Sequence, residues 1–357
     1  MDEDMRDELF HYFERDIGQP PGGARERVLA GLRGAAARDR GRPVQSLAGV
    51  AAAVLMVLVA GTLLLSRAGG QPRPAGSPAA APPPRSGAAV AYDPVRGDLV
   101  LFGGTANGVA LADTWTWDGH RWNRRRPPVV PWTSSTDQAM TYDPVREVVV
   151  RYGQQPSSTW SWDGGIWTQG SLSAITQGPI AMAFDPALSA VLLYGAGASG
   201  ARQLYRWDGL VWTPVSPAGL PDLDGAAMAW DGSRLLLVGS PARQVGGQFV
   251  TETWAWDGAT WTQLGPAVRL PMGTYAAAYD PANHTVVVLV VTADTQSSET
   301  WVWDGSSWRK EHPAHQPPAG RNAAVTYDAR ANRVVLYGGG LWTWSGTDWT
   351  LVEGGAR

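Results

Sequence analysis

The sequence contains no cysteine in its 357 residues. This absence excludes disulfides, thiolate nucleophiles and cysteine-containing metal sites, in whatever compartment the protein works. Charge is also scarce, since charged residues make up 17% of the chain and a single lysine stands among the 29 basic residues. The formal net charge of −3 gives no global field that would attract nucleic acid. We therefore expect no nucleic-acid partner.

The chain does contain a tryptophan-rich unit that recurs six times. Its pattern is Trp-x-Trp-Asp-Gly-x-x-Trp, as in residues 115–122, and all but Trp132 and Trp230 of the 19 tryptophans belong to it. Alternating large and small residues are typical of a strand and Asp-Gly of a tight turn, so each copy predicts a β-hairpin. In the third copy Tyr205 replaces the first Trp, and in the sixth Ser-Gly replaces Asp-Gly. The second and third aromatic positions of each copy are interpreted as structural: Trp117, Trp122, Trp162, Trp167, Trp207, Trp212, Trp256, Trp261, Trp303, Trp308, Trp344 and Trp349.

Two further strands are predicted ahead of each hairpin. The first is rich in small residues and ends in a Tyr-Asp-Pro turn or a variant of it, and the turn Asp recurs every 42 to 50 residues. The second is strongly apolar, and glycine doublets follow it at Gly103-Gly104 and Gly338-Gly339. A sheet of four short strands cannot bury both faces alone, and radial stacking of such sheets solves this. Residues 87–357 therefore predict an all-β, six-bladed β-propeller, with small residues at the axis and tryptophans between the blades.

The repeats also predict how the ring closes. They begin with the small-residue strand and end with the strand led by the last tryptophan, so no strand is left to exchange between the chain ends. We expect six whole blades, of which the first and last meet by side-chain packing alone, with Trp115 and Trp117 near Tyr337 and Trp342.

The glycine doublets, with aromatic residues at fixed offsets behind them, resemble the repeats of bacterial kelch proteins of the galactose oxidase central-domain type. The resemblance covers all six repeats and implies a kelch-type propeller. The doublet decays in the second to fourth repeats, for example to Gly153-Gln154, and it is lost at Val290-Val291. The tight-turn geometry of the family is therefore not carried over to the fifth repeat.

The segment ahead of the repeats differs from them in composition. Residues 1–45 are charged and place Met5, Leu9, Phe13 and Ile17 on one face of a helix. Residues 46–66 carry no charge, and a helix of that length, at ~1.5 Å per residue, is long enough to cross a bilayer. Residues 67–86 are rich in Pro, Gly and Ala and predict a semi-extended stalk.

Arginines precede the uncharged segment, which favours a single-pass anchor in the cell membrane with a cytoplasmic N-terminus and an extracytoplasmic propeller. A cleaved signal peptide is one alternative, although such peptides lie within the first ~30 residues. A buried helix of a soluble protein is the other. Residues 1–45 are either a short, partly ordered tail or a docking module for a cytoplasmic partner.

The sequence predicts no catalytic residue, no metal ligand and no cofactor. Galactose oxidase-like enzymes share the architecture that the resemblance implies, but their copper chemistry uses a Tyr cross-linked to Cys, and cysteine is absent. His312 and His315 have a spacing compatible with one metal ion, yet they lie in a proline-rich loop and are interpreted as solvated. The Asp residues of the Asp-Gly pairs are interpreted as turn residues and not as a ring of carboxylates: Asp118, Asp163, Asp208, Asp257 and Asp304.

The candidate binding residues lie in loops. Arg124, Arg125 and Arg126 run into a proline-rich segment with Trp132, and basic charge beside an aromatic side chain predicts a contact surface for sugar or peptide. The alternative is a basic fringe with a tryptophan that caps the core. Residues 240–248 and 292–298 vary in length and polarity as binding loops on a rigid scaffold do, which adds Gln248 and Gln296.

Two functions remain open from the sequence. The first is a non-enzymatic binding or sensory module outside the cell, with a protein or glycan ligand on the propeller loops. The second is an exported carbohydrate-active enzyme that uses loop carboxylates at one mouth of the propeller. We favour the first, because the scaffold is intact, an anchor is predicted and no catalytic constellation is found; the sequence offers no paired carboxylates at non-repeat positions that can be placed on a common face.

Overall fold

The computed structural model describes residues 81–132, 137–153, 157–170, 177–197, 199–241, 251–265, 270–271, 273–292, 297–318 and 323–354. The predicted tail and membrane helix lie outside these ranges, as do Gln248 and Gln296. Within the ranges, none of the structure is a helix of the length and apolarity that a membrane span requires.

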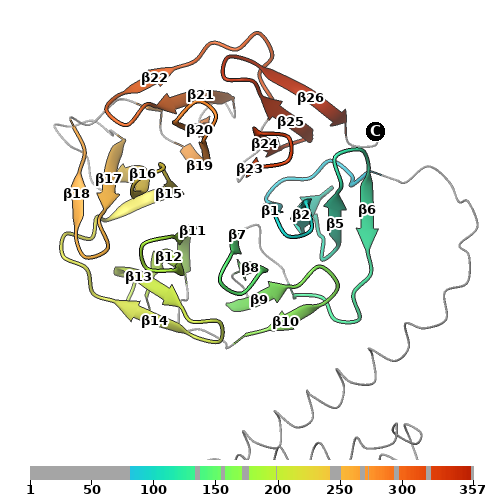
Figure 1. The fold of residues 1–357 in the computed structure, drawn as a ribbon, viewed down its shortest axis with the longest axis horizontal. Helices are drawn as coiled ribbons and strands as arrows, with labels where there is room; N and C mark the ends of the chain where they lie inside the picture. The colour runs from blue at the N-terminus through green and yellow to red at the C-terminus, as the bar shows by residue number, and fades with distance from the viewer. Residues whose placement is uncertain are drawn as a thin grey trace, which may run out of the picture. The chain divides into compact units, whose positions relative to one another are not determined.

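Over the described ranges, six four-stranded antiparallel sheets surround a central axis as a β-propeller (Figure 1). This confirms the predicted all-β, six-bladed architecture. Blade 1 contains β1 (Ala89–Asp93), β2 (Asp98–Phe102), β5 (Thr114–Trp117) and β6 (Trp122–Arg125). Blade 2 contains β7 (Gln138–Asp143), β8 (Val148–Gly153), β9 (Ser158–Trp162) and β10 (Trp167–Gln169). Blade 3 contains β11 (Gln177–Asp185), β12 (Ala190–Ala196), β13 (Arg202–Trp207) and β14 (Trp212–Val215).

The second half of the chain repeats this order. Blade 4 contains β15 (Leu223–Trp230), β16 (Leu235–Pro241), β17 (Glu252–Trp256) and β18 (Trp261–Gln263). Blade 5 contains β19 (Gly273–Asp280), β20 (Thr285–Thr292), β21 (Ser298–Trp303) and β22 (Trp308–Lys310). Blade 6 contains β23 (Ala324–Asp328), β24 (Arg333–Tyr337), β25 (Gly340–Trp344) and β26 (Trp349–Gly354). A small hairpin, β3 (Thr105–Ala106) with β4 (Val109–Ala110), extends from blade 1.

The tryptophans fill the gaps between neighbouring blades. In every repeat the two Trp rings that flank the Asp-Gly or Ser-Gly turn pack against each other, with centroids 5.0 to 5.5 Å apart. Trp162, only 1% exposed, belongs to a cluster with Val100 and Phe102 of blade 1. Indoles bury a large apolar area, so these contacts are a principal source of blade-to-blade cohesion.

The aspartates at the turns organise the backbone. The Asp163 carboxylate accepts the N–H groups of Gly165 and Ile166, each at 2.8 Å, and the other four Asp-Gly turns repeat this arrangement. At Asp208, the N–H groups of Val211 and Leu210 lower the pKa of the carboxyl, because they stabilise its ionised form. These residues are therefore turn residues, as the sequence predicts.

One glycine of the first doublet is required by a close approach of two chain segments. Gly104 has φ of 91°, and a Cβ there would lie 2.8 Å from the carbonyl oxygen of Ser86. In blade 5 the doublet is replaced by Val290-Val291, and β20 continues through both residues as a regular strand.

The four strands of each blade all come from one repeat, so whole-blade closure is confirmed for the described strands. The prediction that side-chain packing alone closes the ring is wrong. Trp122 does pack edge-on against Tyr337 of blade 6, with centroids 5.8 Å apart. Hydrogen bonds also cross this seam, since Arg330 donates to the carbonyl of Gly97 at 2.7 Å and the Tyr337 hydroxyl donates to the carbonyl of Pro82.

Candidate binding groove between blades 1 and 2

A groove of about 400 Å³ lies where the linker from blade 1 to blade 2 meets the outer strands of blade 2. Its lining residues come from the linker and from β9 and β10: Pro128, Val129, Val130 and Trp132 from the linker, and Ser158, Trp160 and Gln169 from blade 2. The Trp132 side chain is 77% exposed. This exposure excludes the alternative in which Trp132 caps the core, and it leaves a large aromatic surface open to solvent.

The proline content of the linker explains its course. Pro127 and Pro128 cannot donate to a strand ladder, and β6 ends just before them at Arg125. Pro131 is buried, so it holds the linker against the propeller while Trp132 beside it stays exposed. The tryptophan is thus carried by a short, stiff segment whose backbone has few conformations.

The opposite wall of the groove is a regular part of blade 2. Trp160 on β9 pairs with Gln169 on β10, and the alternation of a strand places Ser158 and Trp160 on the same face. The Trp160 indole donates its N–H to the Ser158 hydroxyl at 3.3 Å. The wall therefore combines an indole, a hydroxyl and an amide, while the linker contributes mainly apolar surface.

The structure separates the three arginines from this groove. The guanidinium of Arg124 lies over the Trp115 ring, 5.8 Å from its centroid. Arg125 points to the other side of β6, where it donates to Thr116 at 2.9 Å and to Asp98 at 3.3 Å. Arg126 is exposed and is not among the groove-lining residues described. Of the sequence-predicted binding residues in the described part of the chain, only Trp132 lines the groove.

The aromatic position of Trp160 is equivalent in all six blades, but its polar partner differs. The partner stands two residues earlier and accepts the ring N–H or O–H in five blades, as Asp113, Ser158, Gln203, Glu252 and Glu299. In blade 6 the partner position is Gly340, and the buried indole nitrogen of Trp342 has no partner among the described residues. The aromatic residue is therefore common to all six blades, while the charge of the residue two positions before it differs between them.

The junction between blades 6 and 1 is filled by the chain itself. Arg85, which precedes β1, donates to both carboxylate oxygens of Asp113, at 2.5 and 3.0 Å, and to the carbonyl of Gly103. Burial raises the pKa of the Asp113 carboxyl, but the hydrogen bonds from Arg85 and Trp115 outweigh that effect, and its pKa lies below the usual range. Asp113 is therefore ionised, and the guanidinium of Arg85 balances its charge.

One charged residue next to the groove was missed from the sequence. Arg151 on β8 is completely buried, and its strand partner is Trp160 of the groove wall. A comparison between the repeats contains the signal that identifies it, because the other five have leucine or valine at this position: Leu101, Leu193, Leu237, Val288 and Leu336.

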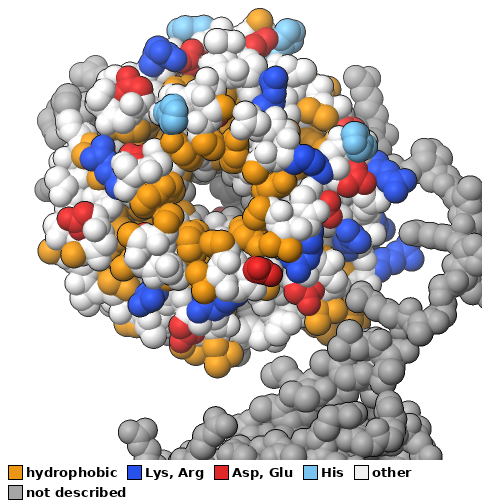
Figure 2. Space-filling view, viewed as in Figure 1, with side chains coloured by type: hydrophobic (Ala, Val, Ile, Leu, Met, Phe, Trp, Pro, Cys, Tyr) orange, Lys and Arg blue, Asp and Glu red, His pale blue; other side chains and the backbone are white. Residues whose placement is uncertain are grey.

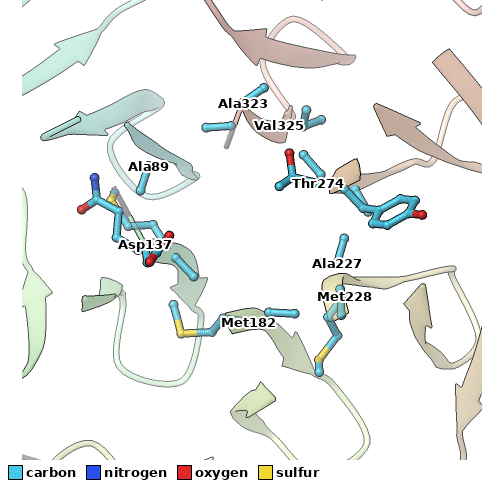
Figure 3. Close-up of a pocket in the computed structure, with 18 of the residues that line it drawn as sticks. Ala89, Asp137, Met182, Ala227, Met228, Thr274, Ala323 and Val325 are labelled. Carbon is cyan, nitrogen blue, oxygen red and sulfur yellow. The ribbon is translucent and has the colours of Figure 1, made fainter. Parts of the chain in front are cut away.

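A second cavity, of about 560 Å³, follows the propeller axis between the first strands of the blades. Figure 3 shows Asp137, Met182, Met228 and Thr274 around it. Alanines supply much of the remaining lining, as predicted for the crowded axis, and hydrophobic side chains surround its mouth in the space-filling view (Figure 2). The polar part of its lining comes from Asp137, Gln138, Asp224 and Thr274.

No group of three His, Asp or Glu residues suited to a metal ion occurs in the described ranges. His315 lies in the linker between blades 5 and 6, where its ring nitrogen Nδ1 and the Asp348 carboxylate are 2.8 Å apart. This pair joins the linker to the turn of the last hairpin.

No family model and no curated protein sequence matches the chain. Solved structures do match it. SapL1 lectin in complex with alpha methyl fucoside has a TM-score of 0.55 and 16% identity over 78% of this chain and 98% of that one. A fucose-specific lectin from Aleuria aurantia has a TM-score of 0.56 and 14% identity over 77% of this chain and 99% of that one. YjhT has a TM-score of 0.54 and 11% identity over 76% of this chain and 98% of that one. At these identities the likeness shows the six-bladed fold alone, and the kelch type stays a prediction.

Proposed function

We propose that the propeller is a non-catalytic carbohydrate-binding module and that the groove between blades 1 and 2 holds the glycan. The observation that carries this proposal is the exposed Trp132 indole, which lines the groove together with Ser158, Trp160 and Gln169. An apolar face with a few placed polar groups suits the C–H face and the hydroxyls of a sugar ring.

The comparisons support a sugar over a peptide. SapL1 and the Aleuria aurantia protein are lectins on the same six-bladed scaffold, and their fucoside ligand is a neutral sugar. Fold alone does not transfer a ligand. From these lectins we therefore take only that a six-bladed propeller can bind a sugar. The position of the site in this chain is argued from its own groove.

The finer parts of the proposal rest on the sequence. We propose a kelch-type propeller on account of the glycine doublets, displayed outside the cell by residues 46–66 with the N-terminus in the cytoplasm. That topology leaves residues 1–45 available to a cytoplasmic partner.

A glycan array probed with the full-length protein, run beside an activity screen on the same glycans, tests the function. We expect binding without turnover, and Trp132→Ala should weaken it by at least about 10-fold, as for a central aromatic contact. Leu210→Ala is a matched control, because Leu210 is also exposed but lies on another blade. Turnover that a single Asp or Glu substitution abolishes would instead identify the protein as an enzyme.

A further inference from the structure

Blade 2 differs from the other five blades at one core position. Arg151 stands where they have leucine or valine, and its side chain is completely buried. A buried guanidinium in a position built for an aliphatic side chain is costly unless its N–H groups are satisfied.

The contacts of Arg151 satisfy only part of the guanidinium. Nε donates to the Gln138 side-chain carbonyl at 2.9 Å, and the guanidinium lies over the Phe102 ring, 4.7 Å from its centroid. Nη1 and Nη2 have no hydrogen-bond partner among the described residues, and no carboxylate there forms an ion pair with them. Burial lowers the pKa of Arg151 to about 9, so the group still carries its charge at neutral pH.

The unsatisfied nitrogens lie next to the groove wall. Arg151 and Gly153 on β8 pair with Trp160 and Ser158 on β9, and both of these partners line the groove. The guanidinium extends over Gly153, where a Cβ would overlap Nη2. The cation therefore lies beside two of the residues that line the groove.

Blade 2 also lacks the acid that three of the other blades have at this level. The position two residues before the aromatic ring is Asp113 in blade 1, Glu252 in blade 4 and Glu299 in blade 5, but Ser158 in blade 2. In the junction of blades 6 and 1, Asp113 at this position neutralises Arg85. Blade 2 thus has the arginine without the carboxylate.

From these observations we infer that the groove between blades 1 and 2 binds a sugar that carries a carboxylate, and that Arg151 is the residue that selects it. Nη1 and Nη2 would take the carboxylate, while Trp132 and Trp160 contact the ring. A bidentate, charge-assisted pair of this kind is the geometry that guanidinium groups favour. The inference rests on the proposed function of the groove and adds the class of its ligand. Because both nitrogens are shielded, binding requires Ser158 or Trp160 to rotate, which should change the tryptophan fluorescence.

The experiment compares binding of D-glucuronate and of the neutral methyl glucoside to the full-length protein, by calorimetry and by tryptophan fluorescence. We expect D-glucuronate to bind at least about 10-fold more tightly, as one charge-assisted hydrogen-bond pair would provide. Arg151→Leu should remove this preference and keep the neutral sugar, since leucine is the residue of blades 1, 3, 4 and 6 at that position. Arg206→Leu, which removes an exposed arginine of blade 3, should change nothing.

A second variant tests the same idea without altering the arginine. Ser158→Asp gives blade 2 the carboxylate that blade 1 has, so it should neutralise Arg151 and also remove the preference for D-glucuronate. This variant decides the question if Arg151→Leu fails to fold.

The outcomes separate this inference from the proposed function. Equal affinity of the wild type for the two sugars, or a preference that survives both variants, overturns the role of Arg151 and leaves sugar binding intact. If acetate or inorganic phosphate binds as tightly as D-glucuronate, the inference that the ligand is a sugar is overturned, and the groove is a site for small anions. Failure of the wild type to bind either sugar overturns this inference, and the glycan array decides separately whether the proposed function stands.

Discussion

Trp167 of blade 2 donates its indole N–H to the hydroxyl of Thr114 in blade 1, at 2.9 Å. The same bond from one blade to the preceding blade recurs in three more junctions: Trp212 to Thr159, Trp308 to Thr253 and Trp349 to Thr300. At the other two junctions the threonine is replaced by Leu204 and Leu341. Trp261, which faces the first of these leucines, has a buried N–H without a partner among the described residues.

This difference predicts unequal costs for one substitution. Trp167→Phe removes a satisfied donor and leaves the buried Thr114 hydroxyl without its bond, whereas Trp261→Phe removes a donor that has no partner. We expect Trp167→Phe to lower the free energy of unfolding by about 1–2 kcal/mol more than Trp261→Phe. Both indoles are almost fully buried, so the loss of packing is similar and each variant serves as the control for the other. Equal losses in urea unfolding would contradict the role of the bond.

The packing of the tryptophans gives a second prediction. Trp162 is 1% exposed and Trp132 is 77% exposed. Trp162→Ala should lower the free energy of unfolding by about 3–5 kcal/mol, because it removes a large buried ring and leaves a cavity. Trp132→Ala should change it by no more than about 0.5 kcal/mol. A large loss at Trp132, measured by denaturant unfolding, would show that its effect on sugar binding is structural.

The sequence predicts the fold well because the fold is repeated. The same strand order is predicted from each of the six repeats. A repeat that departs from the pattern, such as the fifth with Val290-Val291 in place of the doublet, can therefore still be assigned from the other five. The turn function of the aspartates is also local, since Asp163 bonds to backbone groups two and three residues away. Such features need no knowledge of the tertiary neighbours.

The site is less predictable because it depends on contacts between distant segments. Three consecutive arginines look like one basic patch in the sequence, but strand alternation sends Arg124 and Arg125 to opposite faces of β6. Arg85 lies in a segment interpreted as stalk, and only the folded ring brings it to Asp113. Trp132 could be identified because it interrupts the repeat, and Arg151 interrupts it in the same way.

The seam between blades 6 and 1 gives a third prediction. Arg85 is buried, and its ion pair with Asp113 fixes the segment that contacts Tyr337 of blade 6. Arg85→Ala leaves a largely buried carboxylate unpaired, so we expect it to lower the free energy of unfolding by about 2–3 kcal/mol. Faster hydrogen exchange in blades 1 and 6 than in blades 2 to 5 should accompany this loss. Arg309→Ala removes an exposed ion pair and should cost no more than about 0.5 kcal/mol.

The same ion pair predicts a pH dependence. The folded pKa of Asp113 lies below that of an ordinary carboxyl, ~3.9 in an unfolded chain. A group of this kind stabilises the fold above its unfolded pKa, and the contribution is lost as the pH falls through the folded value. The difference in unfolding free energy between the wild type and Arg85→Ala should therefore be full at pH 6 and shrink below about pH 4. A difference that stays constant down to pH 2 would mean that Asp113 is not the partner that matters.

The last prediction concerns the stability cost of Arg151. Burial lowers the pKa of Arg151 to about 9, below the ordinary value of an arginine, because the buried site disfavours the charged guanidinium. At pH 7 the guanidinium is nevertheless charged, and this charge destabilises the fold. Arg151→Leu removes two unsatisfied buried donors and should raise the free energy of unfolding at pH 7 by about 1–3 kcal/mol. Because the folded pKa is depressed, the free energy of unfolding of the wild type rises as the pH rises above about 9. The difference in this free energy between Arg151→Leu and the wild type should therefore become smaller between about pH 8 and pH 10. Urea unfolding of both proteins at several pH values measures this. A variant that is more stable but has lost its preference for D-glucuronate would show that the charge is retained for binding at the expense of stability. A less stable variant would show instead that the guanidinium supports the core, and the role of Arg151 in selecting the ligand would then rest on Ser158→Asp alone.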